Sequence, residues 1–465
     1  MIRLIDRMSE MTALNNDFNS LENAFIIVYG RRRVGKTRLL DEFFKDKKII
    51  KYTAVDTNKK VQLDELKTVF ADYLDDDFLR KQEIVDWSSF FSYLSKVLDK
   101  EKTIYIWIDE FTYLIKNDQS ITSTLQKFID EFLRNSKVYL VVSGSLFGLM
   151  SEKVLSSSSP LYGRRTRDIL LKQIPVGYIN EFLNFDSEDL LRSAFTIGGI
   201  PEYLIVASKY NNYIKFINNE FFKKEGYFFR EPYYLLSQEF KEIKTYFSIL
   251  NSISYGNTKP THIANFVGIK AREIYPYLEL LINYGFVKRI SPIIENNKGG
   301  TYTINDVFFD FWFNFVHKNR ELIEKDNYEI NISQLNSFFG KRFEIFIIEN
   351  FNLFFSSKMF SKYGKWWGNY RDDEGERKEI DMDILALNEK DKEILFGECK
   401  WKDKVNVLSI LNEMKEKIKY IEGNNEKRKE SYAVFAKSFS KKVEEFDGKK
   451  VYCFDLNDIE KILKR

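Results

Sequence analysis

The chain has 465 residues, of which 44% are hydrophobic and 30% are charged. This composition excludes a disordered protein, and the length exceeds what one hydrophobic core usually serves, so two or three domains are expected. The 72 basic and 69 acidic residues nearly balance. The resulting net charge of +3 argues neither for nor against a nucleic-acid partner.

Cysteine and histidine are scarce. Cys399 and Cys453 fit a reducing compartment and exclude a disulfide framework or a cysteine-based zinc site. His262 and His317 are too few for most histidine-based metal sites and are interpreted as structural. The first residues carry charges where a signal peptide needs an apolar core, and no apolar run approaches the ~20 residues of a membrane helix. The sequence therefore predicts a cytoplasmic protein without a membrane partner.

The most specific motif is the segment Gly30-Arg31-Arg32-Arg33-Val34-Gly35-Lys36-Thr37, which matches the phosphate-binding pattern G-x-x-x-x-G-K-[ST]. Its glycines let successive backbone N–H groups point at phosphate oxygens, and the following helix adds its positive end. Lys36 is expected to reach the β- and γ-phosphates, and the Thr37 hydroxyl to bind Mg²⁺. The expected nucleotide contacts in this region are Gly30, Arg33, Val34, Gly35, Lys36, Thr37 and Arg38.

The surroundings of this motif indicate a parallel α/β sheet. The apolar run 24–29 precedes it, and an amphipathic helix begins at Arg38. Helical patterns, notably 88–98 and 123–133, separate further apolar runs at the spacing of βαβ units. These further runs are 49–55, 103–108, 138–142 and 168–174. Strands that alternate with helices predict a parallel sheet covered on both faces.

An acidic pair, Asp109-Glu110, ends one of these apolar runs, at the sheet edge where open α/β sheets bind ligands. Asp109 is expected to hold Mg²⁺ through water, and Glu110 to orient or deprotonate the water that attacks ATP. Another run ends at Ser143-Gly144-Ser145. A hydroxyl there, with Ser143 as the candidate, could sense the γ-phosphate or the attacking water; alternatively, these small residues simply terminate a strand.

Six elements follow one another in the first half of the chain: Asp6-Arg7, the 30–37 loop, Ile108-Asp109-Glu110, Ser143-Gly144-Ser145, Leu161-Tyr162-Gly163-Arg164-Arg165 and Gly198-Gly199-Ile200-Pro201. This series resembles the archaeal-type ATPases of the STAND group, which are relatives of AAA+ ATPases. The resemblance implies that Pro201 lies near the adenine in a small helical lid. It also implies that Arg164 or Arg165 senses the γ-phosphate, although arginines in such loops are often only solvated.

The middle of the chain has the pattern of a winged helix-turn-helix. Helical spacing from about Gln238 is followed by two helical segments, a strand, a polar turn and another strand: 261–268, 274–281, 285–290, 295–300 and 302–304. The candidate contacts to nucleic-acid phosphates are Lys270, Arg272, Lys288 and Arg289.

Two observations argue against that contact. Pro276 falls within the second helix, and Glu273 and Glu279 dilute its positive charge. In ATPases that resemble this chain, such modules often pack on the ATPase core instead. DNA binding by this module, with DNA rather than RNA as the partner, is therefore an open expectation.

Near the C-terminus, the segments 379–386 and 393–401 alternate polar and apolar residues around the turn 388–392, as a half-buried hairpin does. Glu398 and Lys400 share a face of the second strand, and Asp381 lies on the first. This set suits Mg²⁺-assisted phosphodiester hydrolysis, with Asp381 and Glu398 binding the metal and Lys400 positioning or activating water.

This hairpin resembles the PD-(D/E)xK nuclease superfamily, and more closely the C-terminal domain of uncharacterised function that follows many archaeal-type ATPases. The resemblance implies that Glu344, on the helix 339–350, completes the metal site, although Ile380 stands where the motif's name has proline. The alternatives are an exposed salt-bridged hairpin, or a nuclease fold kept only for binding. The nearby tryptophans stack on bases or pack in the core: Trp366, Trp367 and Trp401.

The sequence thus predicts an α/β protein with a P-loop parallel sheet and helical lid, a winged helix-turn-helix and an α/β restriction-endonuclease-like domain. The expected ranges are 1–206 for the ATPase core and the start of the lid, 207–235 for the lid and linker, 236–305 for the winged helix, 306–335 for a linker and 336–465 for the nuclease-like domain.

The expected function is an ATP hydrolase that uses ATP and Mg²⁺ as a nucleotide-dependent switch coupled to nucleic-acid binding or cleavage. The rival is a signalling or scaffold ATPase whose C-terminal domain binds nucleic acid or protein without cutting. In a third possibility, bound ADP keeps the protein inactive until a partner arrives. A homo-oligomer and a regulatory protein partner both stay open.

Overall fold

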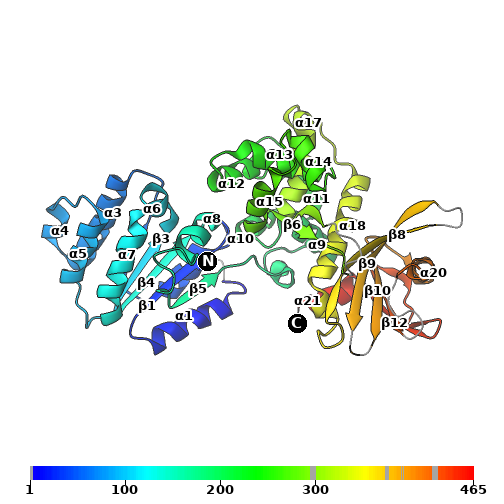
Figure 1. Cartoon of the computed structure of the whole chain (residues 1–465), viewed down its shortest axis with the longest axis horizontal. Helices are drawn as coiled ribbons and strands as arrows, with labels where there is room; N and C mark the ends of the chain where they lie inside the picture. The colour runs from blue at the N-terminus through cyan, green and yellow to red at the C-terminus, as the bar shows by residue number, and fades with distance from the viewer. Residues whose placement is uncertain are drawn as a thin grey trace. The chain divides into compact units, whose positions relative to one another are not determined.

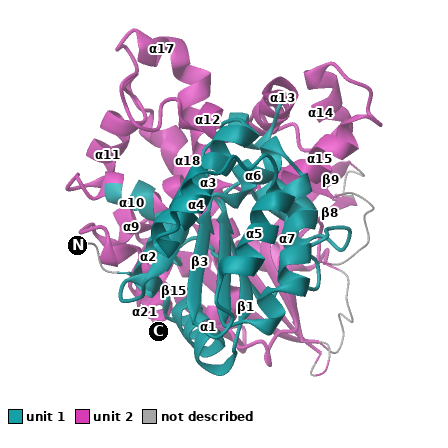
Figure 2. Cartoon of the chain, turned by 90° about the vertical axis from the view of Figure 1, so that its left-hand side faces the viewer, with its two compact units in different colours: residues 1–175, 199–205, 237–241 teal, residues 176–198, 206–236, 242–465 magenta. Residues whose placement is uncertain are grey.

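The computed structural model describes residues 4–293, 300–371, 376–388, 390, 392–421 and 428–464 (Figure 1). Residues 1–3, most of the predicted turn 295–300, and positions 389 and 391 of the predicted turn 388–392 lie outside this part. The chain forms two compact units (Figure 2). Unit 1 comprises 1–175, 199–205 and 237–241, and unit 2 comprises 176–198, 206–236 and 242–465.

Unit 1 is built on a five-stranded parallel sheet in the order β2-β3-β4-β1-β5. Its strands are β1 (Ala24–Tyr29), β2 (Ile49–Thr53), β3 (Ile104–Asp109), β4 (Val138–Gly144) and β5 (Arg167–Leu170). The central strands are buried along nearly their whole length, as expected for a parallel sheet covered on both faces. The predicted parallel sheet is confirmed, although its last strand ends at Leu170 rather than Ile174.

Helices cover both faces of this sheet (Figure 1). Alternate residues of β1 enter different cores, with Ile26 and Val28 on one face and Phe25 and Ile27 on the other. The helices of unit 1 before β5 are α1 (Met8–Ser20), α2 (Lys36–Phe44), α3 (Lys59–Leu74), α4 (Asp77–Lys81), α5 (Trp87–Val97), α6 (Phe111–Asn117), α7 (Ser120–Glu131), η1 (Leu133–Asn135), α8 (Phe147–Met150) and η2 (Ser151–Leu155).

A helical region follows β5 and confirms the predicted helical lid. Its elements are η3 (Val176–Glu181), α9 (Ser187–Ile197), α10 (Pro201–Ala207), α11 (Tyr213–Glu220) and α12 (Glu231–Glu239). The chain returns to unit 1 at Gly199, whose carbonyl accepts a 2.8 Å hydrogen bond from the Ile174 N–H. A Cβ at Gly199 would lie 1.8 Å from the Ile174 carbonyl oxygen, so this approach requires glycine.

Three helices and an antiparallel hairpin occupy the middle of unit 2. They are α13 (Ile243–Ser254), α14 (Pro260–Val267), α15 (Ile274–Asn283), β6 (Val287–Ile290) and β7 (Thr301–Ile304). Helix α15 begins at Ile274, which places Pro276 in its first turn. A proline is tolerated there because the N–H groups of a first turn have no intrahelical partner. The objection raised by Pro276 to a helix-turn-helix is thereby removed.

Aromatic helices connect this region to the C-terminal sheet. They are α16 (Val307–Phe311), η4 (Trp312–Val316), η5 (His317–Asn319), α17 (Arg320–Glu324), α18 (Ile332–Glu349) and α19 (Phe351–Phe354). Phe308, Phe309 and Trp312 are buried, so the range expected to be a linker contributes to the core of unit 2.

The C-terminal sheet is mixed, in the order β14-β15-β12-β10-β9-β8. Strand β10 pairs antiparallel with β9, as the predicted hairpin requires, and parallel with β12. The elements are β8 (Lys362–Arg371), β9 (Arg377–Asn388), β10 (Glu393–Lys400), β11 (Val405–Asn406), α20 (Val407–Ile418), β12 (Lys429–Ala436), β13 (Phe439–Lys441), β14 (Glu445–Phe446), β15 (Lys449–Phe454) and α21 (Leu456–Leu463). Along the part of the chain that the structure describes, no helix is long and apolar enough to span a membrane.

Candidate functional site

The loop between β1 and α2 has the backbone that phosphate binding requires. Gly30 has a φ of +150°, and a Cβ there would lie 2.4 Å from the Leu171 carbonyl oxygen. Gly35, in the left-handed region at φ 96°, immediately precedes α2. The curled loop and the first turn of α2 therefore present backbone N–H groups in the manner of an anion site.

Lys36 is buried at the start of α2. Its Nζ donates hydrogen bonds to the carbonyl oxygens of Gly30 (2.9 Å) and Arg31 (3.2 Å). Burial lowers the pKa of Lys36, while the carboxylates of Glu110 and Asp109 act in the opposite direction. The ammonium group thus lies inside the loop, close to the two acidic residues that end β3.

Asp109, at the end of β3, is hydrogen-bonded to both α2 and β4. Its Oδ2 accepts a 3.0 Å hydrogen bond from the Thr37 hydroxyl, and its Oδ1 accepts one of 2.6 Å from the Ser143 hydroxyl. The Ser143 oxygen in turn accepts from Trp107 Nε1 at 2.8 Å. Strand β4 lies between β1 and β3, which explains why Ser143 reaches Asp109. Thr37 and Asp109 supply the hard oxygen donors that suit Mg²⁺.

Glu110 adopts a left-handed backbone conformation, with φ 52°, directly before α6. Its Oε2 accepts hydrogen bonds from both the hydroxyl (2.6 Å) and the backbone N–H (3.2 Å) of Ser145. From the sequence, Ser143 rather than Ser145 was the candidate residue at the end of β4. The place of Ser145 after the strand that neighbours β3 was the available signal, because parallel strands bring their carboxyl ends to one edge.

Two further residues connect the loop to the rest of unit 1. Arg7 is buried and donates hydrogen bonds to the carbonyl oxygens of Lys172 (2.8 Å) and Val34 (3.3 Å). Arg33 forms a 3.0 Å ion pair with Glu202 on α10. Pro201, the first residue of α10, therefore belongs to the same compact unit as the loop.

The remaining arginines expected near the nucleotide have other partners in this structure. Arg164 pairs with Asp130 at 3.2 Å, and Arg165 pairs with Asp168 at 2.7 Å. Arg38 lies 3.6 Å from Glu42 on the exposed side of α2. These contacts hold the two candidate sensing arginines at the surface of unit 1.

Glu239 adds a titratable carboxyl to the surroundings of the loop. Its Oε1 accepts a 3.2 Å hydrogen bond from the Phe147 N–H. Burial raises the pKa of Glu239 to about 6, and the charges of Arg31 and Lys36 limit the rise. Because the ionised form is the disfavoured one, Glu239 costs no stability below its ordinary pKa. The loss of stability accumulates as the pH rises from that value to about 6 and levels off above it.

We expect the free energy of unfolding of Glu239→Gln, relative to that of the wild type, to increase by about 2 kcal/mol as the pH rises from 4.5 to 7. Glutamine keeps the accepting oxygen without its charge. Chemical denaturation at several pH values would measure the difference, with the exposed Glu83→Gln as the control. A stability difference that stays constant over this range would contradict the expectation.

A second cluster lies on the C-terminal sheet. Asp383 and Glu398, with 7% and 3% exposure, occupy facing positions of β9 and β10, next to the pair Gly397–Ile384. The Cys399 N–H donates a 3.0 Å hydrogen bond to Asp383 Oδ2. The two oxygens of Glu398 bind Lys400 (2.5 Å) and Lys417 (2.7 Å).

Lys365 of β8 joins this cluster to two of the predicted metal ligands. Its Nζ lies 3.1 Å from Glu344, 3.4 Å from Asp381 and 3.8 Å from Asp383. The side chain of Asp381 is 54% exposed, whereas Asp383 is buried. The structure thus brings Glu344, Asp381, Glu398 and Lys400 to one region, and adds Asp383, Lys365 and Lys417, which the sequence analysis did not select.

The charges of the cluster are only partly balanced. Burial, together with the neighbouring carboxylates of Glu398 and Glu344, raises the pKa of Asp383 to about 7. Burial also opposes ionisation of Glu398, but Lys400 and Lys417 lower its pKa overall. Within the described ranges, no group of three or more His, Cys, Asp or Glu side chains is arranged to hold a metal ion. Mg²⁺ commonly takes only one or two protein carboxylates together with substrate phosphates, so Asp383 and Glu398 fit it.

Comparisons with known proteins place the phosphate loop and the C-terminal cluster in two different matched families. A family model described as an ATPase domain predominantly from Archaea matches residues 4–206. A model described as archaeal and bacterial proteins of unknown function matches residues 312–418. An uncharacterized protein of Methanocaldococcus jannaschii is 32% identical over 465 residues, which cover 98% of this chain and 99% of that protein. An uncharacterized ATP-binding protein of the same organism is 42% identical over 48 residues, 10% of this chain and 81% of that protein.

Among solved structures, a Walker-type ATPase of Pyrococcus abyssi is similar with a TM-score of 0.48 and 19% identity, over 67% of this chain and 96% of that one. The loop geometry and the match over residues 4–206 identify an ATP-binding P-loop ATPase domain. The chain belongs to the family of the M. jannaschii protein, with an ATPase domain of the type found predominantly in Archaea and a C-terminal domain of unknown function.

Proposed function

We propose that the chain is an ATP-driven switch whose C-terminal domain cleaves nucleic acid with a divalent metal. The observation that carries this proposal is the facing pair Asp383 and Glu398, buried on neighbouring strands beside Lys400. A carboxylate pair with an adjacent lysine suits phosphodiester hydrolysis better than it suits a structural hairpin, because burying like charges is costly without a compensating ligand.

In the ATPase domain, the loop N–H groups and Lys36 would bind the β- and γ-phosphates of ATP. Glu110 would orient the attacking water and accept its proton, and Ser145 would hold the Glu110 carboxylate in place until then. Thr37 and Asp109 would hold Mg²⁺, which neutralises charge on the phosphates. Ser143 would fix the orientation of Asp109 through their hydrogen bond.

In the C-terminal domain, Asp383 and Glu398 would hold the metal, which supplies a Lewis acid and a water of lowered pKa. Lys400 is bound to Glu398 and would position that water beside the phosphate. Lys365 lies beside Asp383, and also near Glu344 and Asp381. A phosphodiester bound at Asp383 would therefore lie close to this second positive charge. Asp381, which is more exposed, would contribute a further oxygen donor at the rim.

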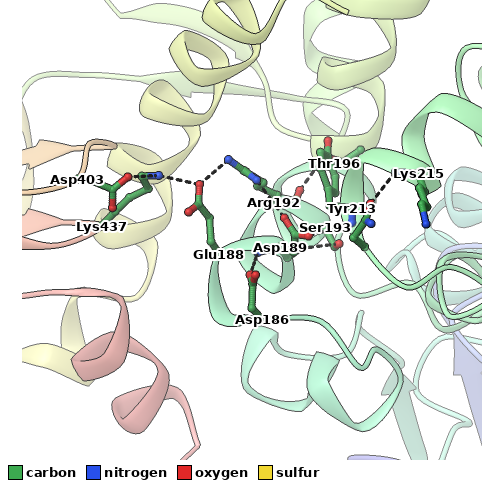
Figure 3. A network of polar contacts seen from close by, with 11 residues as sticks. Asp186, Glu188, Asp189, Arg192, Ser193, Thr196, Tyr213, Lys215, Asp403 and Lys437 are labelled. Atoms are coloured by element: carbon green, nitrogen blue, oxygen red, sulfur yellow. Dashed lines mark hydrogen bonds and ion pairs between the residues drawn. The ribbon is translucent and has the colours of Figure 1, made fainter.

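Helix α9, whose polar contacts are drawn in Figure 3, would couple the two activities. Glu188 binds Arg192 (2.5 Å) on its own helix and Lys437 (2.8 Å), which follows β12. Phe195, near the end of α9, packs on Trp401 with ring centroids 5.7 Å apart, and Trp401 directly follows Lys400. Because α9 leads into Gly199, which is hydrogen-bonded within unit 1, a nucleotide-dependent shift of that connection would reach the cluster.

The test is cleavage of single-stranded, double-stranded and branched DNA with Mg²⁺ or Mn²⁺, with and without ATP. Asp383→Asn is expected to lower the cleavage rate at least about a hundredfold while DNA binding persists. Asp447→Asn, a change in an exposed ion pair with Lys415, is the matched control and should cleave normally. Cleavage that survives in both Asp383→Asn and Glu398→Gln would refute the nuclease role.

One observation favours the non-cleaving rival. Both oxygens of Glu398 already have lysine partners, one on β10 and one on α20, so in this alternative the carboxylate serves to hold α20 on β10. In that case the wild type would bind DNA and hydrolyse ATP but leave every DNA substrate intact with either metal.

A further inference from the structure

A groove of about 1440 Å³ lies in unit 2 beside the charged cluster. One wall comes from the start of α14 and from strands β6 and β7, and the other comes from β8 and β9. Its volume exceeds the 300 to 1,000 Å³ typical of small-ligand pockets, so a segment of a polymer fits it better than a metabolite does.

Exposed cations stand on both walls of this groove. Lys259 and Arg289 belong to the first wall, and Arg377 belongs to the second. Among the described residues, none of these three forms an ion pair, in contrast to most of the cations in the charged cluster. Exposed cations on both walls of a groove suit a chain of phosphates, which releases counterions when it binds.

The groove is also lined by an aromatic side chain, Trp367, that is not buried in the hydrophobic core. Trp367 is partly exposed on β8, whereas its neighbour Trp366 packs in the core of the sheet. Tyr275, which is 52% exposed, lines the opposite wall. Unpaired bases offer their faces to such rings, whereas the bases of a duplex are stacked on one another. The aromatic lining therefore favours a single strand.

The wall formed by β8 and β9 includes residues of the charged cluster. Asp381 pairs with Trp367 across β8 and β9, and both residues line the groove. Lys365 lines it as well and lies 3.8 Å from Asp383. A backbone in the groove would thus pass directly beside the cluster.

We propose that this groove binds a single strand of nucleic acid and delivers its backbone to Asp383 and Glu398. The delivery step rests on the proposed nuclease function, whereas the binding step does not. Arg289 and Arg377 contact phosphates from opposite walls, and Trp367 stacks on a base between them.

Binding of fluorescent dT20 to the full-length protein, followed by anisotropy without metal over a range of salt concentrations, tests this proposal. Arg289→Ala and Arg377→Ala should each weaken binding about fivefold and reduce the slope of log K against log salt by about 0.7. Trp367→Ala should weaken binding about tenfold with an unchanged slope, and Trp367→Phe should restore most of it. Lys325→Ala, which removes an exposed cation directly after α17, is the control and should bind normally.

Three results would overturn the groove. The first is an affinity for a 20-base-pair duplex equal to that for dT20. The second is dT20 binding that none of the groove variants weakens. The third is dT20 binding that is weakened by Lys270→Ala and Arg272→Ala instead. Cleavage that requires Asp383 but is unchanged by substitution of Arg289, Arg377 and Trp367 would also contradict the proposed groove, although it would support the proposed nuclease activity. Groove-dependent binding of dT20 without any cleavage would confirm the binding site and reject the nuclease.

Discussion

Lys36→Ala is expected to slow ATP hydrolysis sharply and to weaken ATP binding at the same time. The ammonium group is the cation held inside the phosphate loop, and a buried, charge-assisted contact to the β- and γ-phosphates acts on both the bound ATP and the transition state. Loss of one such contact should lower the hydrolysis rate at least about a hundredfold. Phosphate release and calorimetric ATP titration would measure the two effects.

The matched control is Lys45→Ala, which removes an exposed lysine immediately after α2 and should leave both quantities unchanged. Hydrolysis that persists in Lys36→Ala would show that the loop is not the catalytic phosphate site. Analysis of nucleotide retained by the purified wild type would also test the ADP-locked state, since an empty site counts against it.

Glu110→Gln should separate binding from chemistry. Glutamine keeps the size of the side chain and an oxygen to accept from Ser145, but it cannot take a proton from water. We therefore expect the hydrolysis rate to fall by about a hundredfold to ten-thousandfold while the ATP affinity stays near the wild-type value. Single-turnover hydrolysis together with ATP titration would establish both.

Ser145→Ala supplies the companion measurement. It frees the Glu110 carboxylate without removing it, so its effect on the rate should be much smaller than that of Glu110→Gln. Rapid hydrolysis by Glu110→Gln would assign the water-activating role to another group. Equal losses in ATP affinity for Glu110→Gln and Lys36→Ala would show that Glu110 shapes the site rather than acting on water.

Local patterns in the sequence were sufficient for much of the architecture. The run 24–29 matches β1 residue for residue, because six apolar residues before a glycine loop can only be a short buried strand in that context. The alternation through 379–386 and 393–401 identified β9 and β10, since a period of two is a property of the strand itself. Motif spacing likewise placed Lys36, Thr37 and Asp109 around one site.

Long-range contacts were beyond those patterns. Sequence alternation places Asp381 and Asp383 on the same face of β9, so it does not indicate which of the two lies opposite Glu398. The register with β10 sets Asp383 opposite Glu398, and the pairing with β8 brings in Lys365. Register depends on the packing of whole strands, so it is a tertiary property.

The sequence by itself therefore determined the phosphate loop, the parallel sheet and the charged hairpin, because each is encoded by neighbouring residues. Only the tertiary structure decided that Ser145 holds Glu110, that Arg7 supports the loop, and that a cationic groove leads to the C-terminal carboxylates. Each of these joins segments distant in the chain. Their geometry follows from strand order and register, which the covalent sequence specifies only through the folded chain as a whole.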